Sequence, residues 1–581
     1  MAEAVLARLD PETRRAHHLA LAETVERSGP SDAMEGFLLR HLEAGGEPQR
    51  AAVQARLAAD RAASVFALER AASLYRTALR LGRFPPDESA SLRASLGDAL
   101  GRCGHGPDAA EAYLAVAEST EGSARLDAQR RAAQHLLGCG QVGRGVGVLR
   151  TVAKDIGLRF PASELEGTAS LIWQRMKIAS LGDRWVERDE RDVDPEVLRR
   201  IDVFHAIGFG LSTVGLVRGE DLTARGLYLA MRTGERKRLA RAMLLESQYQ
   251  ACATERGRRR ARWLVAEGAR IAEDTKDAHL AGLVAATRHF NAFLEGRFRE
   301  CLDLRASTEE LLREGRGEQW HRNWVRLADL FARVHFVGEL GAERARIDEY
   351  LKDAARRDDR LFETSMRAAA AVRWLASDEP GVLLELIDEP TWVVTGVARS
   401  TLREHGTWPQ IYDLWARAQH ALYTDDAGAL ARVEEGFVAA ERSLLMRAVQ
   451  VMRIRARWIH GLVALALARH GGGRRATALA GAIAKKQERE GTGYAAAIAG
   501  LLRSGIASAA GDRRAARSAL SEALPLARRA ELRLAASAME WRLGQWTPGE
   551  EGASLGAAGA RRLEAEGVVD VERMARLLVP T

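Results

Sequence analysis

The chain has 581 residues, of which 28% are charged and 47% hydrophobic, with only 14 prolines and 6% aromatic residues. Abundant Ala, Leu, Arg and Glu favour helices throughout. The formal net charge of +7 is small beside 86 basic and 79 acidic residues that are interspersed, so the composition does not indicate a nucleic-acid-binding protein.

We expect no secretory targeting signal in the first residues of this sequence. Residues 1–15 are charged and lack the apolar core of a signal peptide. The longest apolar stretch, residues 462–468, is far shorter than the roughly 20 residues that span a bilayer. The cysteines lie far apart and form no C-x-x-C motif, as expected of buried thiols in a reducing compartment: Cys103, Cys139, Cys252 and Cys301. We expect a soluble, cytoplasmic protein without membrane association.

Residues 1–47 are predicted to form a helical lead-in. Asp10 is placed to cap a helix that has Pro11 in its first turn. This helix should end near Ser28-Gly29-Pro30, and a second short helix, residues 32–43, should end at Gly45-Gly46.

Residues 48–160 contain a repeated pattern of small and aromatic residues. One copy has Leu96-Gly97, Leu100, Ala109, Tyr113 and Val116, which take positions 7, 8, 11, 20, 24 and 27 of a tetratricopeptide (TPR) unit of about 34 residues. Two flanking copies repeat parts of this spacing: Ala71, Tyr75 and Ala78 upstream, and Ala133, Leu136, Gly145, Leu149 and Val152 downstream.

Small residues at positions 8 and 20 let the two helices of a unit approach closely, and the tyrosines fill the gap toward the next unit. A single pair cannot bury its apolar face, so neighbouring pairs stack into a continuous core. The predicted fold is all-α, a TPR-like superhelical solenoid of antiparallel helix pairs. A less regular helical array is the alternative.

Residues 161–390 are predicted to form an irregular TPR-like helical array. Its least regular part is 161–200, where a mixed-charge connection, residues 183–194, should lead into a helix at Pro195. Gly296 and Phe298 indicate a turn and the start of a helix further along.

Residues 391–545 are predicted to hold C-terminal TPR-like repeats, after a break marked by Gly396, Gly406 and Pro409. The two clearest units carry position-20, position-24 and position-27 residues: Ala476, Ala480 and Ile483, then Ala516, Leu520 and Ala523. Residues 546–581 are predicted to be capping helices, the last of which, 571–578, should cover the apolar end of the stack.

We find no catalytic, cofactor-binding or metal-binding residues in the sequence. There is no G-x-x-x-x-G-K-[ST] loop, kinase motif or H-E-x-x-H pair. The glycines at 101, 104 and 106 resemble a Gly-rich loop, but they lie between two predicted helices and not after a strand. We therefore predict that the chain is not an enzyme.

The tryptophans and one run of arginines allow either a structural or a functional interpretation. Trp320 and Trp324 are one helical turn apart, and Trp408 and Trp415 two turns apart. They are either core anchors or aromatic anchors that line a groove. The basic run between Arg256 and Arg262 is either a solvated face or a docking patch for an acidic partner. The partner-binding residues themselves cannot be named from the sequence.

The chain resembles the C-terminal TPR region of large bacterial, myxobacteria-like signalling proteins, in which a serine/threonine kinase and a STAND-type AAA ATPase precede the repeats. The resemblance rests on three segments: Arg14, Arg15 and His17 through Leu74-Tyr75; residues 202–234 with Gly210-Leu211 and Arg218-Gly219; and Gly567 with residues 573–580. The kinase and ATPase domains are absent here, so no catalytic residue carries over. The resemblance implies either a stand-alone remnant or an internal start at Met1 of a longer protein.

These observations lead to the hypothesis of a non-enzymatic TPR scaffold or regulatory module in bacterial signal transduction. It would bind a protein or peptide, with a kinase or ATPase in cis or in trans as the candidate partner. The alternatives are a transcriptional regulator of the STAND type without a visible DNA-binding domain, and a cryptic enzyme.

Overall fold

The computed structural model describes residues 10–28, 34–158, 164–211, 216–252, 254–315, 319–388 and 407–579. They form two compact units: the first comprises Met1–Cys139 and Arg144–Gly157, the second Gly140–Gly143 and Leu158–Thr581. Within the described ranges the chain is helical and contains no strand, apart from an isolated bridge between Arg188 and Glu235. The all-α prediction is confirmed. The predicted breaks at Gly29-Pro30, Gly396 and Gly406 lie outside the described residues.

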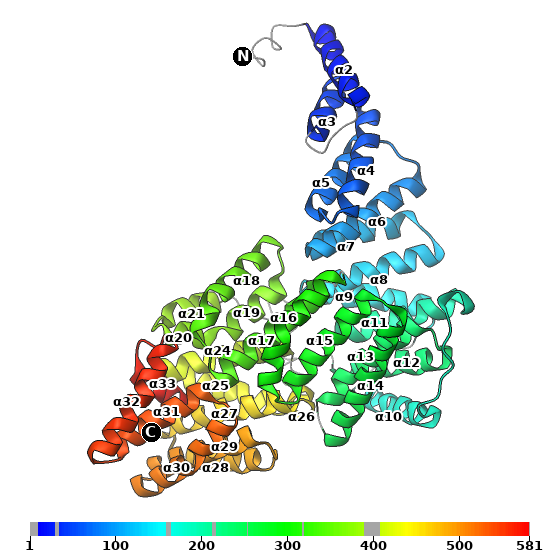
Figure 1. Cartoon of the computed structure of the whole chain (residues 1–581). Helices are drawn as coiled ribbons and strands as arrows, with labels where there is room; N and C mark the ends of the chain where they lie inside the picture. The colour runs from blue at the N-terminus through cyan, green and yellow to red at the C-terminus, as the bar shows by residue number, and fades with distance from the viewer. Residues whose placement is uncertain are drawn as a thin grey trace. The chain divides into compact units, whose positions relative to one another are not determined.

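The first unit is a row of helices in which each packs against the next in the chain (Figure 1). Asp10 caps the first helix as predicted, because its side chain accepts hydrogen bonds from the backbone N–H groups of Glu12 and Thr13, at 3.1 and 2.9 Å. The helices are α2 (Pro11–Ser28), α3 (Glu35–Ala44), α4 (Pro48–Ser64), α5 (Leu68–Leu81), α6 (Pro86–Cys103), α7 (Gly106–Ser119), α8 (Gly122–Gly138) and α9 (Val142–Asp155).

The small residues of the TPR pattern lie where helices of a pair touch. A β-carbon on Gly97 of α6 would lie 2.8 Å from the ring of Tyr113 on α7. Ala109 is fully buried in the same pair. A larger residue at either place would force the helices apart.

Two successive helix pairs each contain a hydrogen bond that the sequence pattern did not predict. The Tyr75 hydroxyl of α5 donates to Asp60 of α4 at 2.7 Å, and the Tyr113 hydroxyl of α7 donates to Asp98 of α6 at 2.6 Å. The same contact therefore joins the second helix to the first in two consecutive pairs. This repetition identifies them as copies of one TPR-like unit.

The second unit continues with paired helices. Its α11 begins at Pro195 as predicted, with Asp194 accepting from the Glu196 N–H at 2.8 Å. The helices of its first part are α10 (Glu164–Leu181), α11 (Pro195–Leu211), α12 (Leu216–Thr233), α13 (Arg236–Ala251), α14 (Glu255–Thr275), α15 (Ala278–Leu294), α16 (Phe298–Glu314), α17 (Gln319–Leu330), the π-helical η2 (Phe331–Val337), α18 (Arg344–Arg356), α19 (Arg360–Ala369), α20 (Ala371–Ala376) and α21 (Pro380–Leu386), with short 3-10 turns η1 (Glu190–Asp192) and η3 (Gly341–Glu343).

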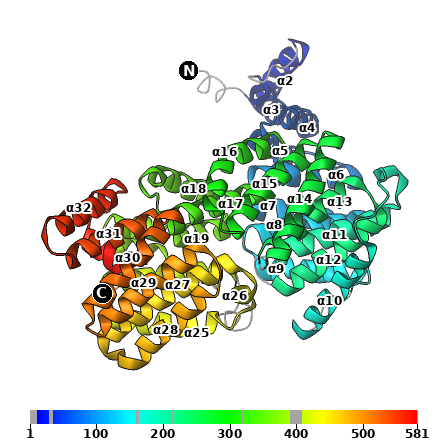
Figure 2. The same ribbon diagram turned by 60° about the horizontal axis from the view of Figure 1, so that its bottom comes forward.

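The last part of the second unit, residues 407–579, again consists of paired helices, seen from a second side in Figure 2. Ala516 and Leu520 are fully buried, in line with their predicted repeat positions, whereas Ala476 is only half-buried. The helices are α24 (Trp408–Thr424), α25 (Ala427–Ala440), α26 (Leu444–Ala448), α27 (Gln450–Leu467), the π-helical η4 (Ala468–Gly472), α28 (Gly473–Glu488), α29 (Gly493–Ala509), α30 (Arg513–Arg529), α31 (Arg533–Trp546), α32 (Gly549–Ala565) and α33 (Val571–Leu578).

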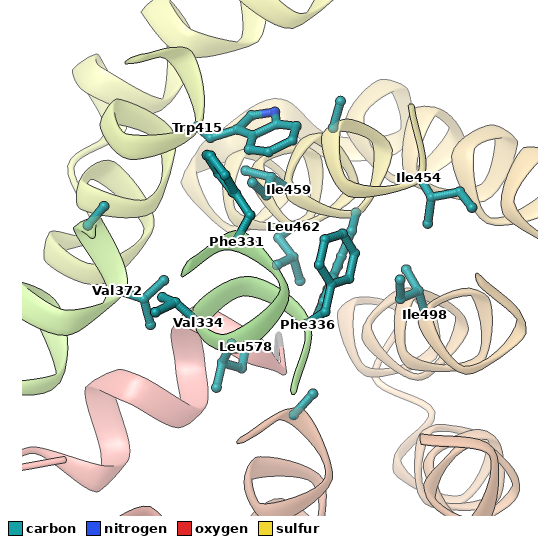
Figure 3. Close-up of a cluster of buried hydrophobic side chains, with 14 of the residues drawn as sticks. Phe331, Val334, Phe336, Val372, Trp415, Ile454, Ile459, Leu462, Ile498 and Leu578 are labelled. Carbon is teal, nitrogen blue, oxygen red and sulfur yellow. The ribbon is translucent and has the colours of Figure 1, made fainter. Parts of the chain in front are cut away.

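The two parts of the second unit share one apolar core. Figure 3 shows side chains of η2, α20, α24, α27, α29 and α33 meeting there, among them Phe331 and Phe336. The ring of Tyr494 from α29 lies 5.4 Å from that of Phe298 on α16. The backbone N–H of Val569 donates to the carbonyl of Ala376 at 2.8 Å. The chain therefore returns onto its own middle helices within this unit.

No described helix is both long enough and apolar enough to cross a lipid bilayer.

Candidate protein-binding surface

The chemistry-bearing motifs considered in the sequence have structural roles. Gly104, with φ of 88°, ends α6 in the left-handed conformation, so the glycines at 101, 104 and 106 belong to a turn between two helices. Among the described residues, no three His, Cys, Asp or Glu side chains lie close enough together to hold a metal ion.

The basic run on α14 is largely engaged within the chain. Arg260 lies 2.7 Å from Asp183 and Arg262 lies 3.0 Å from Glu255, while Arg258 donates to Gln450. Each of these contacts neutralises or occupies a guanidinium group. The structure therefore gives no support to an open basic patch at these three positions.

Trp320, Trp408 and Trp415 are buried, and Trp408 and Trp415 belong to the same apolar core. Trp415 is buried at 2% exposure and belongs to the shared core, so it is a core anchor. Trp320, Trp324 and Trp408 meet edge to face, with 5.9 Å between the ring centroids of Trp324 and Trp408. Trp324 and Trp408 also line a pocket.

Helix α10 exposes an apolar face. Leu165, Ile172, Trp173 and Met176 have exposed fractions of 81, 56, 54 and 52%. Residues that are 7, 8 and 11 positions after the first share one side of a helix, because a helix has about 3.6 residues per turn. We name these four residues the α10 surface.

The opposite face of α10 packs on the protein and carries both apolar and polar residues, with Ile178 and Leu181 against a buried apolar cluster. Gln174 is buried, and the Ser170 hydroxyl donates to Asp221 of α12 at 2.6 Å. Arg175 lies 3.2 Å from Glu246 of α13 and also pairs with Glu220 of α12. Helix α10 therefore has apolar residues on both faces, and those of the outer face remain exposed.

The carboxyl groups that hold Arg175 are poorly solvated. Burial raises the pKa of Glu246 to about 7, against the opposing attraction of Arg175. Burial also raises the pKa of Glu220. The Gln250 side chain donates a further hydrogen bond to Glu246 at 2.7 Å. These contacts fix the orientation of α10, since rolling it to bury the apolar face would leave buried carboxylates without their cation.

A cation also positions the exposed indole. The Lys177 ammonium lies 5.5 Å from the ring centroid of Trp173 and 5.1 Å from that of Tyr228 on α12. A cation–π contact at an exposed site contributes about 0.5–1 kcal/mol.

The sequence did not reveal this surface. The spacing of Leu165, Ile172, Trp173 and Met176 is readable, but apolar residues at helical spacing normally predict a buried face. Which apolar residues of α10 face outward depends on its contacts with α12 and α13, which are distant in sequence.

Comparisons with known proteins add little to this geometry. No family model and no curated protein matches the chain. Among solved structures, the chain is similar to the crystal structure of the APC/C hetero-tetramer Cut9-Hcn1, with 11% identity, a TM-score of 0.41, and 89% of this chain and 88% of that chain covered. It is also similar to a circular tandem repeat protein with novel repeat topology and enhanced subunit contact surfaces, with 14% identity, a TM-score of 0.12, and coverages of 98 and 96%.

Both TM-scores are too low to carry an argument about fold or function. The TPR-like assignment therefore rests on the helix pairing and on the repeated Tyr–Asp contacts described above. None of the comparisons links the chain to a kinase or to a STAND protein.

Proposed function

We propose that this chain is a non-enzymatic scaffold that binds a protein partner through the α10 surface. The observation that carries the proposal is the exposed apolar face of α10, on which Ile172 and Trp173 lie while Arg175 pairs with buried carboxylates. Burial of apolar area contributes about 25 cal/mol per Å² to association. A contiguous exposed apolar patch is typical of a protein interaction site.

The partner that fits best is an amphipathic helix. Ile172, Trp173 and Met176 follow Leu165 by 7, 8 and 11 positions and form a row along α10. The apolar face of a second helix can pack along such a row. A bacterial signalling role, with a kinase or ATPase as the partner in cis or in trans, is part of the proposal and is supported by the sequence resemblance alone.

Site-specific photocrosslinking tests the proposal. Benzoylphenylalanine at Ile172 should crosslink to a partner helix in the native host, and the same group at the exposed Glu550 of α32 should not. The double variant Ile172→Gln/Met176→Gln should abolish partner binding measured with purified components while leaving the circular dichroism spectrum unchanged. Crosslinks at Ile172 only to a second copy of this chain, or only to its first unit, would contradict a separate partner.

Two assays test the other readings. ATP hydrolysis or phosphotransfer by the purified chain would contradict a non-enzymatic scaffold. Binding to duplex DNA at low salt, where phosphate contacts are strongest, would favour a transcriptional regulator. We expect neither.

A further inference from the structure

A partly enclosed pocket lies in the second unit, and none of the four residues of the α10 surface lines it. The space that the centre of a water molecule can reach inside it is about 80 Å³, and its walls come from α11, α13, α15, α17 and the start of α24. Protein interiors rarely contain voids larger than a water molecule. The inner space exceeds by several times the volume of about 10 to 15 Å³ that one buried water needs, so the pocket can admit a small molecule.

Flat rings from four helices form much of the wall. The rings of Phe209 on α11 and His321 on α17 are stacked with centroids 5.1 Å apart. Phe290 on α15 packs edge to face against Trp324, at 5.7 Å, and lies 6.3 Å from Trp408. Planar walls favour a planar ligand, because offset stacking and edge-to-face contacts need flat partners.

The pocket is lined mainly by apolar side chains and by no Asp or Glu. Its polar side chains include the imidazoles of His205 and His321, and its one guanidinium, that of Arg241, pairs with Asp202. The side chains of Gln248 and Thr287 also line it, and neither makes a hydrogen bond with another residue in the described part of the chain. A buried charge without a partner is costly, so neither a cation nor a strongly charged anion is favoured.

We infer that this pocket binds a small, uncharged, planar aromatic molecule that carries a hydrogen-bonding group for Gln248 or Thr287. The chain would then respond to a small-molecule effector in addition to a protein partner. This inference does not depend on the proposed function, because none of the four residues of the α10 surface lines the pocket.

The probe is N-phenyl-1-naphthylamine, a neutral secondary amine that carries a naphthyl and a phenyl group. Its fluorescence rises in an apolar environment. Titrated into the full chain, it should bind saturably with one site per chain and should quench tryptophan emission by energy transfer from Trp324 and Trp408. Ala286→Phe places a ring in the pocket and should weaken binding by about tenfold or more, equivalent to 1.4 kcal/mol or more.

Gln248→Leu keeps the volume of the side chain and serves as the second variant if Ala286→Phe does not fold. It should weaken the binding of the probe, which has an N–H group, more than that of naphthalene, which has none. A probe that binds without saturation, or whose affinity neither variant changes, would overturn the inference.

The α10 variant separates this test from that of the proposed function. Ile172→Gln/Met176→Gln should leave the affinity for the probe unchanged. If it abolishes probe binding while the pocket variants do not, the probe reports the α10 surface and the pocket inference fails. A partner protein that competes with the probe and binds the Ala286→Phe variant more weakly would overturn the inference. The pocket would then take a side chain of the partner and not a free small molecule.

Discussion

Arg175 of α10 lies 3.2 Å from Glu246 of α13, and the same guanidinium pairs with Glu220 of α12. The guanidinium of Arg175 therefore pairs with two poorly solvated carboxyl groups, those of Glu220 and Glu246. Because two nearby carboxylates repel each other in a low-dielectric site, one of them tends to retain a proton. The attachment of the α10 surface to the second unit should consequently depend on pH.

Glu246→Gln should reduce the pH dependence of stability. The pKa of Glu246 is raised by burial to about 7 from an ordinary value of 4.5, so the folded chain binds this proton more tightly than the unfolded chain. The free energy of unfolding should therefore fall as the pH rises from 4.5 to 7, by about 3 kcal/mol from this group, and should then level off.

Urea denaturation at pH 5 and pH 8 measures this effect. The glutamine variant should lose less stability between the two pH values than the unsubstituted chain. The control Glu550→Gln, at an exposed carboxylate on α32, should keep the original dependence. An identical loss in the Glu246 variant would show that Glu246 is ionised at both pH values.

Two glycines of α9 should respond to alanine in opposite directions. A β-carbon on Gly145 would lie 2.7 Å from the side chain of Leu137 on α8, whereas a β-carbon on Gly147 would meet nothing within 4 Å. Gly145→Ala should destabilise the first unit by about 1–3 kcal/mol through overpacking. Gly147→Ala should stabilise it by about 0.4–1 kcal/mol, since it restricts the unfolded chain.

Thermal unfolding of the two variants side by side decides the matter, because they share one helix and one substitution. Shifts of the same sign would mean that Gly145 is not a position of close helix approach.

The features that the sequence predicted correctly are local. Gly97, Ala109 and Tyr113 identify a helix pair because a short turn brings their helices together wherever the unit lies in the chain. The Tyr75–Asp60 contact has the same 15-residue separation as Tyr113–Asp98 and was readable in principle. It was missed because the TPR pattern assigns the tyrosine to packing and not to a hydrogen bond.

The features that could not be predicted are contacts between distant segments. Tyr494 packs on Phe298, and Val569 donates to Ala376, across nearly two hundred residues of chain in each case. Residue spacing within a repeat carries no information about which repeats meet. The pocket was beyond prediction for the same reason, since Trp324 and Trp408 belong to helices that are not neighbours in sequence.

Gly338 tests the contact between the middle and the last helices of the second unit. It ends η2 with φ of 84°, and its β-carbon would lie 2.3 Å from the Cβ and 2.7 Å from the backbone nitrogen of Leu534 on α31. Gly511 also has a positive φ, of 78°, but nothing lies within 4 Å of its β-carbon. Alanine at Gly511 should cost about 1–2 kcal/mol for the left-handed backbone alone.

Gly338→Ala should destabilise the second unit by clearly more than Gly511→Ala, because a backbone atom cannot yield as a flexible side chain can. The difference between the two free energies of unfolding in urea isolates the contact with α31. Equal losses would indicate that α31 does not approach η2 closely.

The last helix should contribute to the stability of the whole second unit. α33 packs against α24 and α31, and Leu578 is 5% exposed in the core that also contains Val334 and Val372 (Figure 3). Leu578→Ala should cost about 2–5 kcal/mol, the range for buried leucine truncations. Val569→Ala is the matched control, since that side chain is 68% exposed and its backbone contact with Ala376 is unaffected.

Hydrogen exchange distinguishes a shared core from a terminal helix that merely frays. Leu578→Ala should accelerate exchange in α24 and α20 as well as in α33. Acceleration confined to α33 would mean that the last helix is an independent appendage and that the core ends before it.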